Sequence, residues 1–576
     1  MATLEHIRHS LAHLLATAAL EHDPKALLAI GPVIENGFYY DIQFSTSFSD
    51  EHLPKLESRM RELVGENLSF DRIDATPTQA REQFADQPFK LELIDELEKE
   101  GAEISLYQTG TFIDLCRGGH VSNTQEIPGD AFRLTKVAGS YWRGDETKAR
   151  LIRIYGIAFS NKEELDAYIT QLEEAEKRDH RKVGKELDLF TFSELVGPGL
   201  PLWTPRGTIV RTELDKYVWE LRAKHGYERV TIPHITKKDL YVTSGHWEKY
   251  GDDLFRIKTR EDKEYALKPM NCPHHAQLFA RHPYSYRQMP QRYAETTMVY
   301  RDEQSGELGG LTRVLSITQD DSHVFCRHSQ VKEEFFRIWD IVDTFYGTFG
   351  FKLRVRLSFH DPKTQEKYLG TPEIWKDAED ALRDIAKERG ADSFEAPGEA
   401  AIYGPKLDFM AKDSIGREHQ VATIQLDMLQ PERFDLTCVN EKGEKERIVM
   451  IHCAVMGSIE RFCAVLLEHT GGSLPLFLSP VQVSVLPVKD THETYAASVV
   501  SALKEKGVRA ELSAADNLGK RIRAAKIMKV PFVIVIGDKE VEANTLTLEH
   551  RDEGKTEGMT LEDLLQKVTS TISSRL

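Results

Sequence analysis

The sequence predicts a multidomain protein of mixed α/β and α+β class. At 576 residues the chain is too long for one hydrophobic core, and about three domains are expected. A charged helix pattern begins at the capping box 160–163 and continues from Lys162 to about Lys185, which is typical of an exposed element between two domains. In residues 477–576 strand and helix patterns alternate, which indicates βαβ units and a small, mainly parallel sheet.

The composition is that of a globular protein, with 40% apolar and 29% charged residues. The sequence has no run of about twenty apolar residues and no signal-peptide pattern at its start. The six cysteines show neither a CxxC motif nor a regular spacing, so they do not predict a disulfide framework. We therefore expect a cytoplasmic protein with no membrane partner. The net charge of −17 argues against indiscriminate nucleic-acid binding, although an acidic body can carry a local basic face.

The N-terminal region combines two histidines on a helix with a downstream Cys/His pair. Residues 4–20 have a helical apolar pattern in which His9 and His13 share one face. The stretch TGTFIDLCRGGHV predicts a strand that ends at Cys116, followed by a glycine-rich turn and His120. Cys and His side chains of this kind can bind zinc. They can also form a metal-free pocket for acid/base chemistry, or simply be solvated, and the spacing leaves all three interpretations open.

The central region contains a predicted hairpin with charge at its tip. Two apolar strand patterns within residues 298–319 are joined by a polar, glycine-rich loop. Arg301 and Arg313 lie on either side of this loop, with Glu303 beside them. Arginines that face each other across a hairpin repel unless an anion lies between them, and a polyphosphate is the obvious candidate. Arg461, near the start of a later predicted helix, is a second candidate for a phosphate contact.

Three residues from distant segments, Cys272, His323 and His452, each lie next to a predicted strand. Any one of them alone is more often a packed or surface residue. Together they are zinc-ligand types, and three protein ligands leave a tetrahedral zinc with one open position, as in catalytic zinc sites.

The C-terminal region carries the densest basic cluster of this acidic protein. No acidic residue occurs in 517–536, whereas Lys520, Arg521, Arg523, Lys526 and Lys529 follow one another there. Such a run is usually a solvated helix face. The alternative is a contact with the phosphate backbone of a nucleic acid.

Short motifs spread over nearly the whole chain resemble those of the bacterial type of threonyl-tRNA synthetase, a class II aminoacyl-tRNA synthetase. In the order of that family they are HSLAH (9–13), GPVIENGFYYD, CRGGH (116–120), YWRGD, MNCP, YRDEQSGELGGLTRV, QDDSHVFC, YGPKLDF and IHCAVMGSIERF. One such string would say little, but this many in family order is specific.

The resemblance implies four segments: an α+β editing domain (1–158) that hydrolyses Ser-tRNA, a linker helix (159–196), a class II catalytic domain with an antiparallel sheet and a zinc site (197–476), and an α/β anticodon-binding domain (477–576). It implies a threonine-specific ligase that uses L-threonine, tRNA(Thr) and ATP with Mg²⁺, with one Zn²⁺ per subunit. Pro233 matches the motif 1 proline, which implies a homodimer through that strand. The ubiquitin-like domain that usually precedes HSLAH in the family is missing from this sequence.

In the catalytic domain the resemblance implies a role for each matching residue. The zinc ligands would be Cys272, His323 and His452. ATP would be bound by Arg301 at the α-phosphate, Glu303 at the adenine, and Arg313, Gln420 and Arg461. The amino acid would be surrounded by Gln319, Asp321, Tyr403 and Lys406, with Asp321 as the partner of its ammonium group. Arg301, Arg461 and Lys406 are the implied catalytic residues.

The other two domains receive implied sites as well. The family's editing pocket, which is not thought to need a metal, matches His9, His13, Tyr40, Lys90, Asp114, Cys116 and His120. In the anticodon domain Glu540 matches an anticodon contact, and Lys520 and Arg523 are expected to contact the tRNA backbone.

Four positions depart from the family pattern. His274 stands beside a zinc ligand where glycine is general, and it is a competing ligand candidate. Gly119 replaces a proline in CRGGH, which loosens the turn but keeps Cys116 and His120. In the anticodon domain Glu549 replaces an arginine, and an asparagine contact falls near Ala515, so the base contacts there differ from the family's.

Two other classes of function fit parts of the pattern. A tRNA- or mRNA-binding regulator without turnover would not need the complete set of zinc, phosphate and substrate positions. A zinc hydrolase or stand-alone trans-editing enzyme would need only the HxxxH/CxxxH region. A proline or serine synthetase would not keep the HSLAH module in this form. The sequence therefore favours the threonine enzyme.

Overall fold

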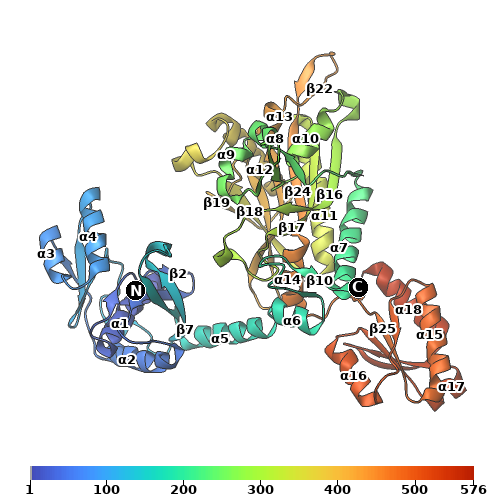
Figure 1. Cartoon of the computed structure of the whole chain (residues 1–576), viewed down its shortest axis with the longest axis horizontal. Coiled ribbons are helices and arrows are strands. Elements are labelled where there is room, and N and C mark those ends of the chain that lie inside the picture. The colour runs from blue at the N-terminus through green and yellow to red at the C-terminus, as the bar shows by residue number, and fades with distance from the viewer. Residues whose placement is uncertain (1–2, 576) are drawn as a thin grey trace. The chain divides into compact units, whose positions relative to one another are not determined.

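The structure, a computed structural model, describes residues 3–575 (Figure 1). The chain divides into two compact units, Met1–Glu173 and Glu174–Leu576. The boundaries expected at 158/159, 196/197 and 476/477 stay predictions. Within residues 3–575, no helix combines the length and the apolar character that crossing a membrane requires.

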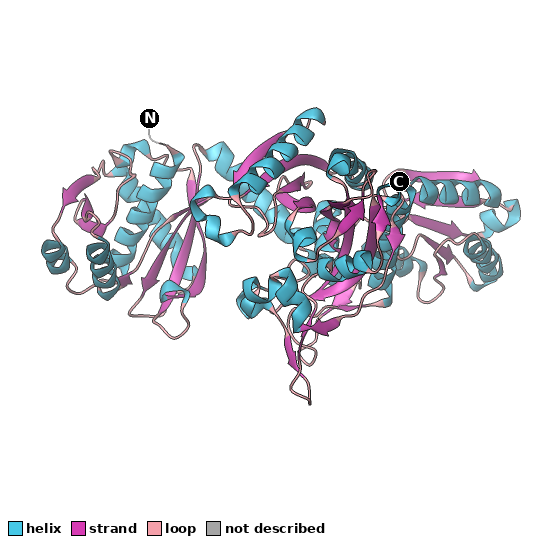
Figure 2. Cartoon of the chain, turned by 90° about the horizontal axis from the view of Figure 1, so that it is seen from above, coloured by secondary structure: helices cyan, strands magenta, loops and turns pink. Residues whose placement is uncertain are grey.

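In the first unit a long helix packs against an antiparallel sheet (Figure 2). Helix α1 (Leu4–His22) confirms the helix expected over residues 4–20, and the side chain of Thr3 caps it by accepting a hydrogen bond from the His6 amide. Leu11, Leu14 and Leu15 of α1 are fully buried in the core of the unit. The sheet has the order β1-β3-β8-β7, with β2 paired to β3. These strands are β1 (Leu27–Leu28), β2 (Val33–Ile34), β3 (Gly37–Gln43), β7 (Phe132–Tyr141) and β8 (Arg150–Ala158).

A smaller antiparallel sheet completes this unit. Its order is β4-β5-β6, and β6 ends at Leu115, one residue before the predicted end at Cys116. The remaining elements are α2 (Leu53–Gly65), β4 (Asp71–Asp74), α3 (Pro77–Gln83), α4 (Pro88–Glu100), β5 (Ser105–Thr109) and β6 (Phe112–Leu115).

The helix predicted from Lys162 to about Lys185 is interrupted in the structure. Helix α5 (Lys162–Lys177) ends, and a second helix, α6 (His180–Glu186), begins after it. Asp179 is the N-cap of α6, and its side chain accepts a hydrogen bond from the Arg181 amide. An aspartate that caps a new helix in this way adopts a non-helical backbone conformation, so the preceding helix cannot continue through it.

The second unit is built on a large, mostly antiparallel sheet, which confirms the sheet type expected for residues 197–476. Among the described residues its order is β11-β16-β17-β24-β21-β20-β18-β19, and within it only the outermost pairs are parallel. Its strands are β11 (Glu228–Arg229), β16 (Gln291–Tyr300), β17 (Ser316–Cys326), β18 (Lys352–Phe359), β19 (Ser393–Pro397), β20 (Lys406–Lys412), β21 (Glu418–Asp427) and β24 (Val449–Ser458).

Four long helices, together with Val183 of α6, supply apolar side chains that pack with this sheet into the main core. They are α7 (Pro205–Lys224), α11 (Val331–Thr348), α12 (Pro372–Glu388) and α14 (Ile459–Thr470). Short elements surround the sheet: α8 (Lys238–Ser244), α9 (His246–Lys249), α10 (Cys272–Ala280), α13 (Leu429–Arg433), and the small sheets β9–β10 (Phe190–Thr191, Leu202–Trp203), β12-β14-β13 (Ile235–Lys237, Glu264–Leu267, Arg256–Lys258) and β15-β22-β23 (Tyr284–Ser285, Thr437–Val439, Lys445–Arg447).

The C-terminal sheet is mixed and not mainly parallel as predicted. In the order β26-β25-β27-β28-β29 the first two pairings are parallel and the last two antiparallel. The difference arises because the chain returns after β27 in short connections, which only antiparallel strands allow. The elements are β25 (Val483–Pro487), α15 (Glu493–Glu505), β26 (Ala510–Leu512), α16 (Leu518–Ile527), β27 (Phe532–Ile536), α17 (Asp538–Ala543), β28 (Leu546–His550), β29 (Gly554–Met559) and α18 (Leu561–Ser574).

A β-bulge in the large sheet is held by one buried carboxylate. Gln319 of β17 is opposite Ser458 of β24, but Asp321 is opposite Ala454, so three residues of β24 face Asp320 alone. The Asp320 carboxylate accepts hydrogen bonds from the amides of Val455 and Met456, both at 2.9 Å. It also accepts one from Arg222 of α7 at 3.1 Å, and both ionic side chains are buried. Burial raises the pKa of Asp320, and the contacts with Arg222 and the two amides limit the rise to about 6. The carboxyl group is therefore mainly ionised at neutral pH.

Replacing Asp320 by asparagine is expected to destabilise the second unit by about 3–5 kcal/mol, because Arg222 would keep a buried charge without its partner. Calorimetric unfolding measures this as a lower midpoint temperature. The matched control is Asp435→Asn, which breaks a surface ion pair with Arg447 (2.7 Å) and should leave the midpoint nearly unchanged. Equal midpoints for the two variants would contradict the role given to Asp320.

Candidate active site

Two neighbouring strands and a helix start bring the predicted zinc ligands together. His323 of β17 and His452 of β24 are direct cross-strand partners, and such side chains lie on the same face of the sheet. Cys272 is the first residue of α10. The three side chains are buried, and one ligand atom of each lies within 4.8 Å of the others. Nε2 of His323 is 3.0 Å from Nδ1 of His452.

The chemistry of this cluster fits a zinc ion. Two nitrogens bound tetrahedrally to one zinc lie about 3.3 Å apart, given Zn–N bonds of about 2.0–2.1 Å, which is close to the observed separation. Burial lowers the pKa of His323 well below its usual value, so the ring is neutral, as a ligand must be. Burial raises the pKa of the Cys272 thiol well above its usual value, so a thiolate here needs a cation beside it. The role of the three residues as zinc ligands stays a prediction.

Two side chains missed by sequence reasoning orient the histidines. Asp427 Oδ2 lies 2.9 Å from Nε2 of His452, and Nδ1 of His275 lies 2.7 Å from Nδ1 of His323. Contacts of this kind fix which nitrogen of a ligand histidine carries the proton. His274, the competing candidate, is outside the cluster among the described residues, and both its ring nitrogens are buried without a hydrogen-bond partner. The departure at position 274 therefore leaves the three-residue cluster intact.

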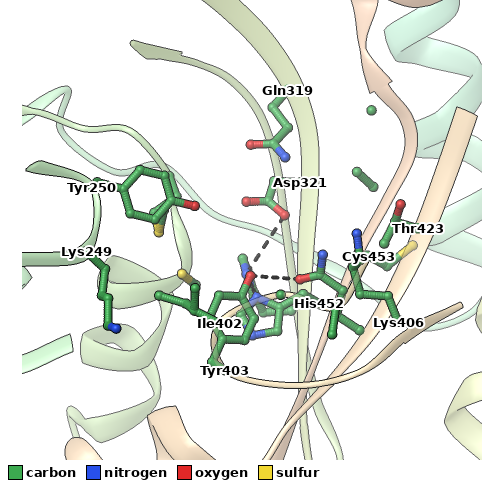
Figure 3. Close-up of a pocket in the computed structure, with 18 of the residues that line it drawn as sticks. Lys249, Tyr250, Gln319, Asp321, Ile402, Tyr403, Lys406, Thr423, His452 and Cys453 are labelled. Carbon is green, nitrogen blue, oxygen red and sulfur yellow. Dashed lines mark hydrogen bonds and ion pairs between the residues drawn. The ribbon is translucent and has the colours of Figure 1, made fainter. Parts of the chain in front are cut away.

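The cluster forms part of the wall of a cavity of about 550 Å³. Gln319, Asp321, Tyr403 and Lys406 line the same cavity, and Figure 3 shows their side chains converging on it. Asp321 accepts a hydrogen bond from Asn271 (3.0 Å), and Tyr403 donates one to Gln425 (2.7 Å). The structure thus brings the four predicted amino-acid contacts to the cluster. Their roles stay predictions.

A second cavity, of about 700 Å³, adjoins the first, because Arg301, Gln319 and Gly457 line both. Its wall contains the predicted ATP residues Arg301, Glu303, Arg313, Gln420 and Arg461. Arg313 forms an ion pair with Glu303 at 2.6 Å. Nε of Arg301 is buried without a hydrogen-bond partner, and burial lowers the pKa of Arg461. Incompletely neutralised guanidinium groups in the wall of this cavity favour an anionic ligand.

Asp408, a fully buried residue of β20, holds one side chain from the wall of each cavity and was not predicted. Its carboxylate accepts hydrogen bonds from Gln420 (2.8 Å) and Arg356 (3.0 Å), and the Lys406 ammonium lies 3.4 Å away. Arg356 also donates to the Gln420 side-chain oxygen (2.7 Å). The LDF part of the motif YGPKLDF offered the only sequence signal for Asp408.

The first unit contains a separate cluster made of the predicted N-terminal residues. Cys116 Sγ lies 3.4 Å from Nε2 of His9 and 3.2 Å from Nε2 of His120. The His13 ring packs 4.2 Å from the His120 ring, centroid to centroid. Burial lowers the pKa of His120 to about 2 and raises that of Cys116 to about 11. At neutral pH these side chains are uncharged.

A buried polar triad continues this cluster. Lys90 forms an ion pair with Asp114 and donates a hydrogen bond to the Tyr40 hydroxyl at 3.1 Å. Tyr40 in turn donates to Asp114 at 2.6 Å, and Nε2 of His13 is 3.9 Å from the same carboxylate. All seven residues predicted for the N-terminal pocket therefore lie together. Their roles stay predictions.

The CRGGH turn depends on its glycines. Gly118 and Gly119 have φ angles of +102° and +89°, in a region that L-residues with a side chain rarely adopt. Proline, whose φ is fixed near −65°, does not fit this backbone at position 119. The turn still holds Cys116 and His120 in contact, as the sequence analysis expected.

Comparisons with known proteins agree with these sites. Residues 255–470 match the model of the family "tRNA synthetase class II core domain (G, H, P, S and T)", 482–571 "Anticodon binding domain", and 104–155 "Threonyl and Alanyl tRNA synthetase second additional domain". A threonine–tRNA ligase of Rubrobacter xylanophilus is 47% identical over 99% of this chain and 89% of its own length. One of Gloeobacter violaceus is 46% identical over 97% and 90%. This chain belongs to the threonine–tRNA ligase family.

A solved structure is similar as well. The RNA binding domain of threonyl-tRNA synthetase from Cryptosporidium parvum Iowa II superposes with a TM-score of 0.65 at 39% identity, over 68% of this chain and 98% of that one. The fold class implied by the family resemblance is therefore confirmed, including the class II core, the additional domain and the anticodon-binding type of domain.

The C-terminal candidates of the family resemblance divide into exposed and structural side chains. Lys520 and Arg523 are exposed on α16. Arg521 of the same run is buried and donates hydrogen bonds to the carbonyls of Pro487 (2.8 Å) and Ser513 (2.7 Å). It therefore does not belong to the exposed basic face that the sequence suggested. Glu540 accepts hydrogen bonds from the Gly537 amide and the Thr547 hydroxyl, both at 2.9 Å, and its predicted anticodon contact stays a prediction.

One more buried histidine near the first cavity was missed. Nδ1 of His246 lies 2.7 Å from the Ser244 hydroxyl oxygen, whereas Nε2 is buried without a partner. Its ring lies 6.2 Å from the Tyr403 ring. Burial lowers its pKa to about 3, so it is a neutral histidine with an available ring nitrogen. Its SGHW context carries no signal that reasoning from one sequence would detect.

The raised pKa of Cys116 predicts slow alkylation by iodoacetamide at neutral pH. With a pKa of about 11, only about one thiol in a thousand is ionised at pH 8, and the rate should rise up to about pH 11. Mass spectrometry of the modified peptide measures the rate, with glutathione as the reference thiol. Alkylation at pH 7 as fast as that of glutathione would contradict a neutral cluster.

Proposed function

We propose that this protein activates L-threonine with ATP, transfers the threonyl group to tRNA(Thr), and hydrolyses mischarged Ser-tRNA(Thr) in its first unit. The observation that carries the proposal is the adjoining pair of cavities, one walled by the Cys272, His323 and His452 cluster and the other by arginines. Membership of the threonine–tRNA ligase family supports it over nearly the whole chain.

Zinc is the metal we propose for the Cys272, His323 and His452 cluster, one ion per subunit. When bound, it would supply a Lewis acid to which the neutral amino group and the hydroxyl group of threonine can both coordinate. Asp321, in the wall of the same cavity, would accept a hydrogen bond from this amino group. Valine lacks the hydroxyl, and a site that requires that group rejects such an analogue by about 10⁴–10⁵.

In the activation step, the threonine carboxylate attacks the α-phosphorus of ATP and pyrophosphate leaves. We assign the α-phosphate to Arg301, the adenine side to Glu303, and further phosphate contacts to Arg313 and Arg461. Lys406 and Gln420, both tied to Asp408, would hold the reacting groups in position. Mg²⁺ accompanies ATP. The enzyme forms no covalent intermediate, so its contribution is positioning and charge neutralisation.

Serine differs from threonine by one methyl group, which is worth only about 1–3 kcal/mol in binding. A second site that removes serine is therefore needed, and the match of residues 104–155 to the second additional domain supports its place in the first unit. The neutral cluster of His9, Cys116 and His120 would orient a water molecule on the seryl ester. Lys90, paired with Asp114, would bind the 3′ end of the tRNA.

We further propose a homodimer through the segment around Pro233. Two features support it: β11 is an edge strand of the large sheet, and Ile235 and Val242 just beyond Pro233 are 52% and 47% exposed. Exposed apolar side chains beside an open edge are typical of an interface. The domain boundaries given by the sequence analysis, the cytoplasmic location and the tRNA contacts of Lys520, Arg523 and Glu540 are part of the same proposal.

Arg301→Ala is expected to abolish threonine-dependent ATP–pyrophosphate exchange while zinc content stays at about one per chain, because the arginine neutralises charge on ATP and does not bind the metal. Exchange assays and metal analysis on one sample measure both. Cys272→Ser is the matched control and should lose zinc. Near-normal exchange by Arg301→Ala would refute the assignment, and absence of exchange in the zinc-loaded parent protein would refute ligase activity.

His9→Ala is expected to lower hydrolysis of preformed Ser-tRNA(Thr) by about 10²-fold or more, because the water would lose one of its orienting groups. Exchange with threonine and with serine should be unchanged, since the synthetic cavity lies in the other unit. His52→Ala, at a half-buried histidine of the same unit that lies outside the cluster, serves as the control. Unaltered hydrolysis in the His9 variant would exclude this cluster as the editing site.

A further inference from the structure

His180, the first residue of α6, lies against two parts of the proposed ATP site without reaching its cavity. The side chain is buried, and Asp179 caps the helix just before it. One ring nitrogen faces Glu468 near the end of α14, whose first turn contains Arg461. The other faces the loop between β16 and β17, which contains Arg313.

The contacts of the ring define one neutral tautomer. Nε2 accepts a hydrogen bond from the backbone amide of Leu311 at 3.0 Å, so it carries a lone pair. Nδ1 then bears the proton and donates it to Oε1 of Glu468 at 2.7 Å. Arg417 holds the other oxygen of Glu468 at 2.6 Å. Both ring nitrogens are occupied, so the group of Asp179, His180 and Glu468 has no free imidazole ligand for a metal.

The loop approaches the ring so closely that it requires glycine at one position. Gly310 has a φ of +55°, and a Cβ atom there would lie 2.3 Å from Nε2 of His180. Leu311, the next residue, is fully buried in the main core. Two backbone hydrogen bonds also hold the loop. The Gly309 amide donates to the Arg313 carbonyl (3.2 Å), and the Leu315 amide donates to the Gly199 carbonyl (2.9 Å).

Thr312 and Arg313 line the second cavity, which is the phosphate cavity of the proposed function. They directly follow Leu311, the residue held by the ring. At the base of the loop the Arg301 amide donates to the Leu315 carbonyl at 3.1 Å. We infer that His180 is a positioning residue for ATP: it anchors the backbone at Leu311, and thereby sets Arg313 and its partner Glu303 against the nucleotide. The inference rests on the proposed function. It adds a residue outside the cavity on which the adenylation step depends.

Two substitutions separate the two hydrogen bonds of the ring. In His180→Gln the amide oxygen can reach the Nε2 position and still accept from Leu311. In His180→Asn the shorter amide can still donate to Glu468 but cannot reach the loop. We expect His180→Asn to raise the KM for ATP about fivefold to tenfold, as expected for one lost hydrogen bond. The KM for threonine, the zinc content and Ser-tRNA hydrolysis should stay within about twofold, and His180→Gln should retain a KM for ATP within about threefold.

His469→Ala is the matched control, because alanine removes the hydrogen bond that this ring accepts. His469 lies in the last turn of α14, and its Nδ1 accepts a backbone hydrogen bond from Ser414 at 2.9 Å. The bond is of the same type, but it does not hold the loop, so the KM for ATP should not change. Equal effects of Asn and Gln at position 180, or an equal rise in the KM values for ATP and threonine, would overturn the inference.

A double-mutant cycle tests the inference even if His180→Asn folds poorly. Gly310→Ala places a methyl group against the ring and should raise the KM for ATP in the parent enzyme. The additional rise should be smaller in a His180→Ala background, where the ring is gone. Additive effects would overturn the inference. Loss of exchange in the unmodified enzyme would instead refute the proposed function, so the two failures are distinguishable.

Discussion

The buried ion pair of Asp320 and Arg222 is the constraint on which the geometry of the second unit depends. A bulge that places three residues of β24 against one of β17 leaves backbone amides without strand partners, and buried amides must be satisfied. The Asp320 carboxylate accepts two of them, and Arg222 compensates its charge. Past the bulge, Ser458 caps α14 by accepting a hydrogen bond from the Arg461 amide at 3.0 Å. The bulge thus determines where Arg461 enters the phosphate cavity.

The side chains of β17 alternate between the two faces of the sheet, and the two faces have different roles. Successive side chains of a strand point to opposite faces. Gln319, Asp321 and His323 line the first cavity. Between them, Asp320 binds Arg222, and Ser322 donates to the Cys453 carbonyl at 3.0 Å. One strand therefore carries the proposed substrate and metal contacts on one face and the hydrogen bonds that hold the sheet on the other. A one-residue shift of register would exchange the two sets.

Site residues could be predicted from the sequence where the residue type alone indicates the chemistry. Charged and metal-binding types at Arg301, Arg313, Cys272 and His323 stand out by residue type, and the structure brings them to two adjoining cavities. Which of these side chains contact one another can be seen only in the folded structure. The sequence cannot show that His323 is opposite His452, nor that His275, and not its neighbour His274, contacts the histidine cluster.

The same limit applies to residues whose environment reverses their expected role. Arg521 lies in a basic run, yet two backbone carbonyls hold it in the interior. Asp408 looks like an ordinary strand residue, but five donors converge on its carboxylate from Arg356, Ser358, Lys406, Gln420 and Thr423. The break between α5 and α6 depends on one cap at Asp179, a residue that also fits a helix surface.

The two candidate sites differ in electrostatics in the way their proposed reactions require. The phosphate cavity keeps permanent charges in a partly buried setting, since guanidinium groups remain protonated even where burial lowers their pKa, as at Arg461. The proposed adenylyl transfer needs such charges, because the triphosphate and the attacking carboxylate are both negatively charged. The cluster of the first unit keeps its histidines neutral through burial. Rings with pKa values this low are neutral but weak bases, so burial suits this cluster to the proposed orientation of a water molecule by hydrogen bonds and not to removal of its proton.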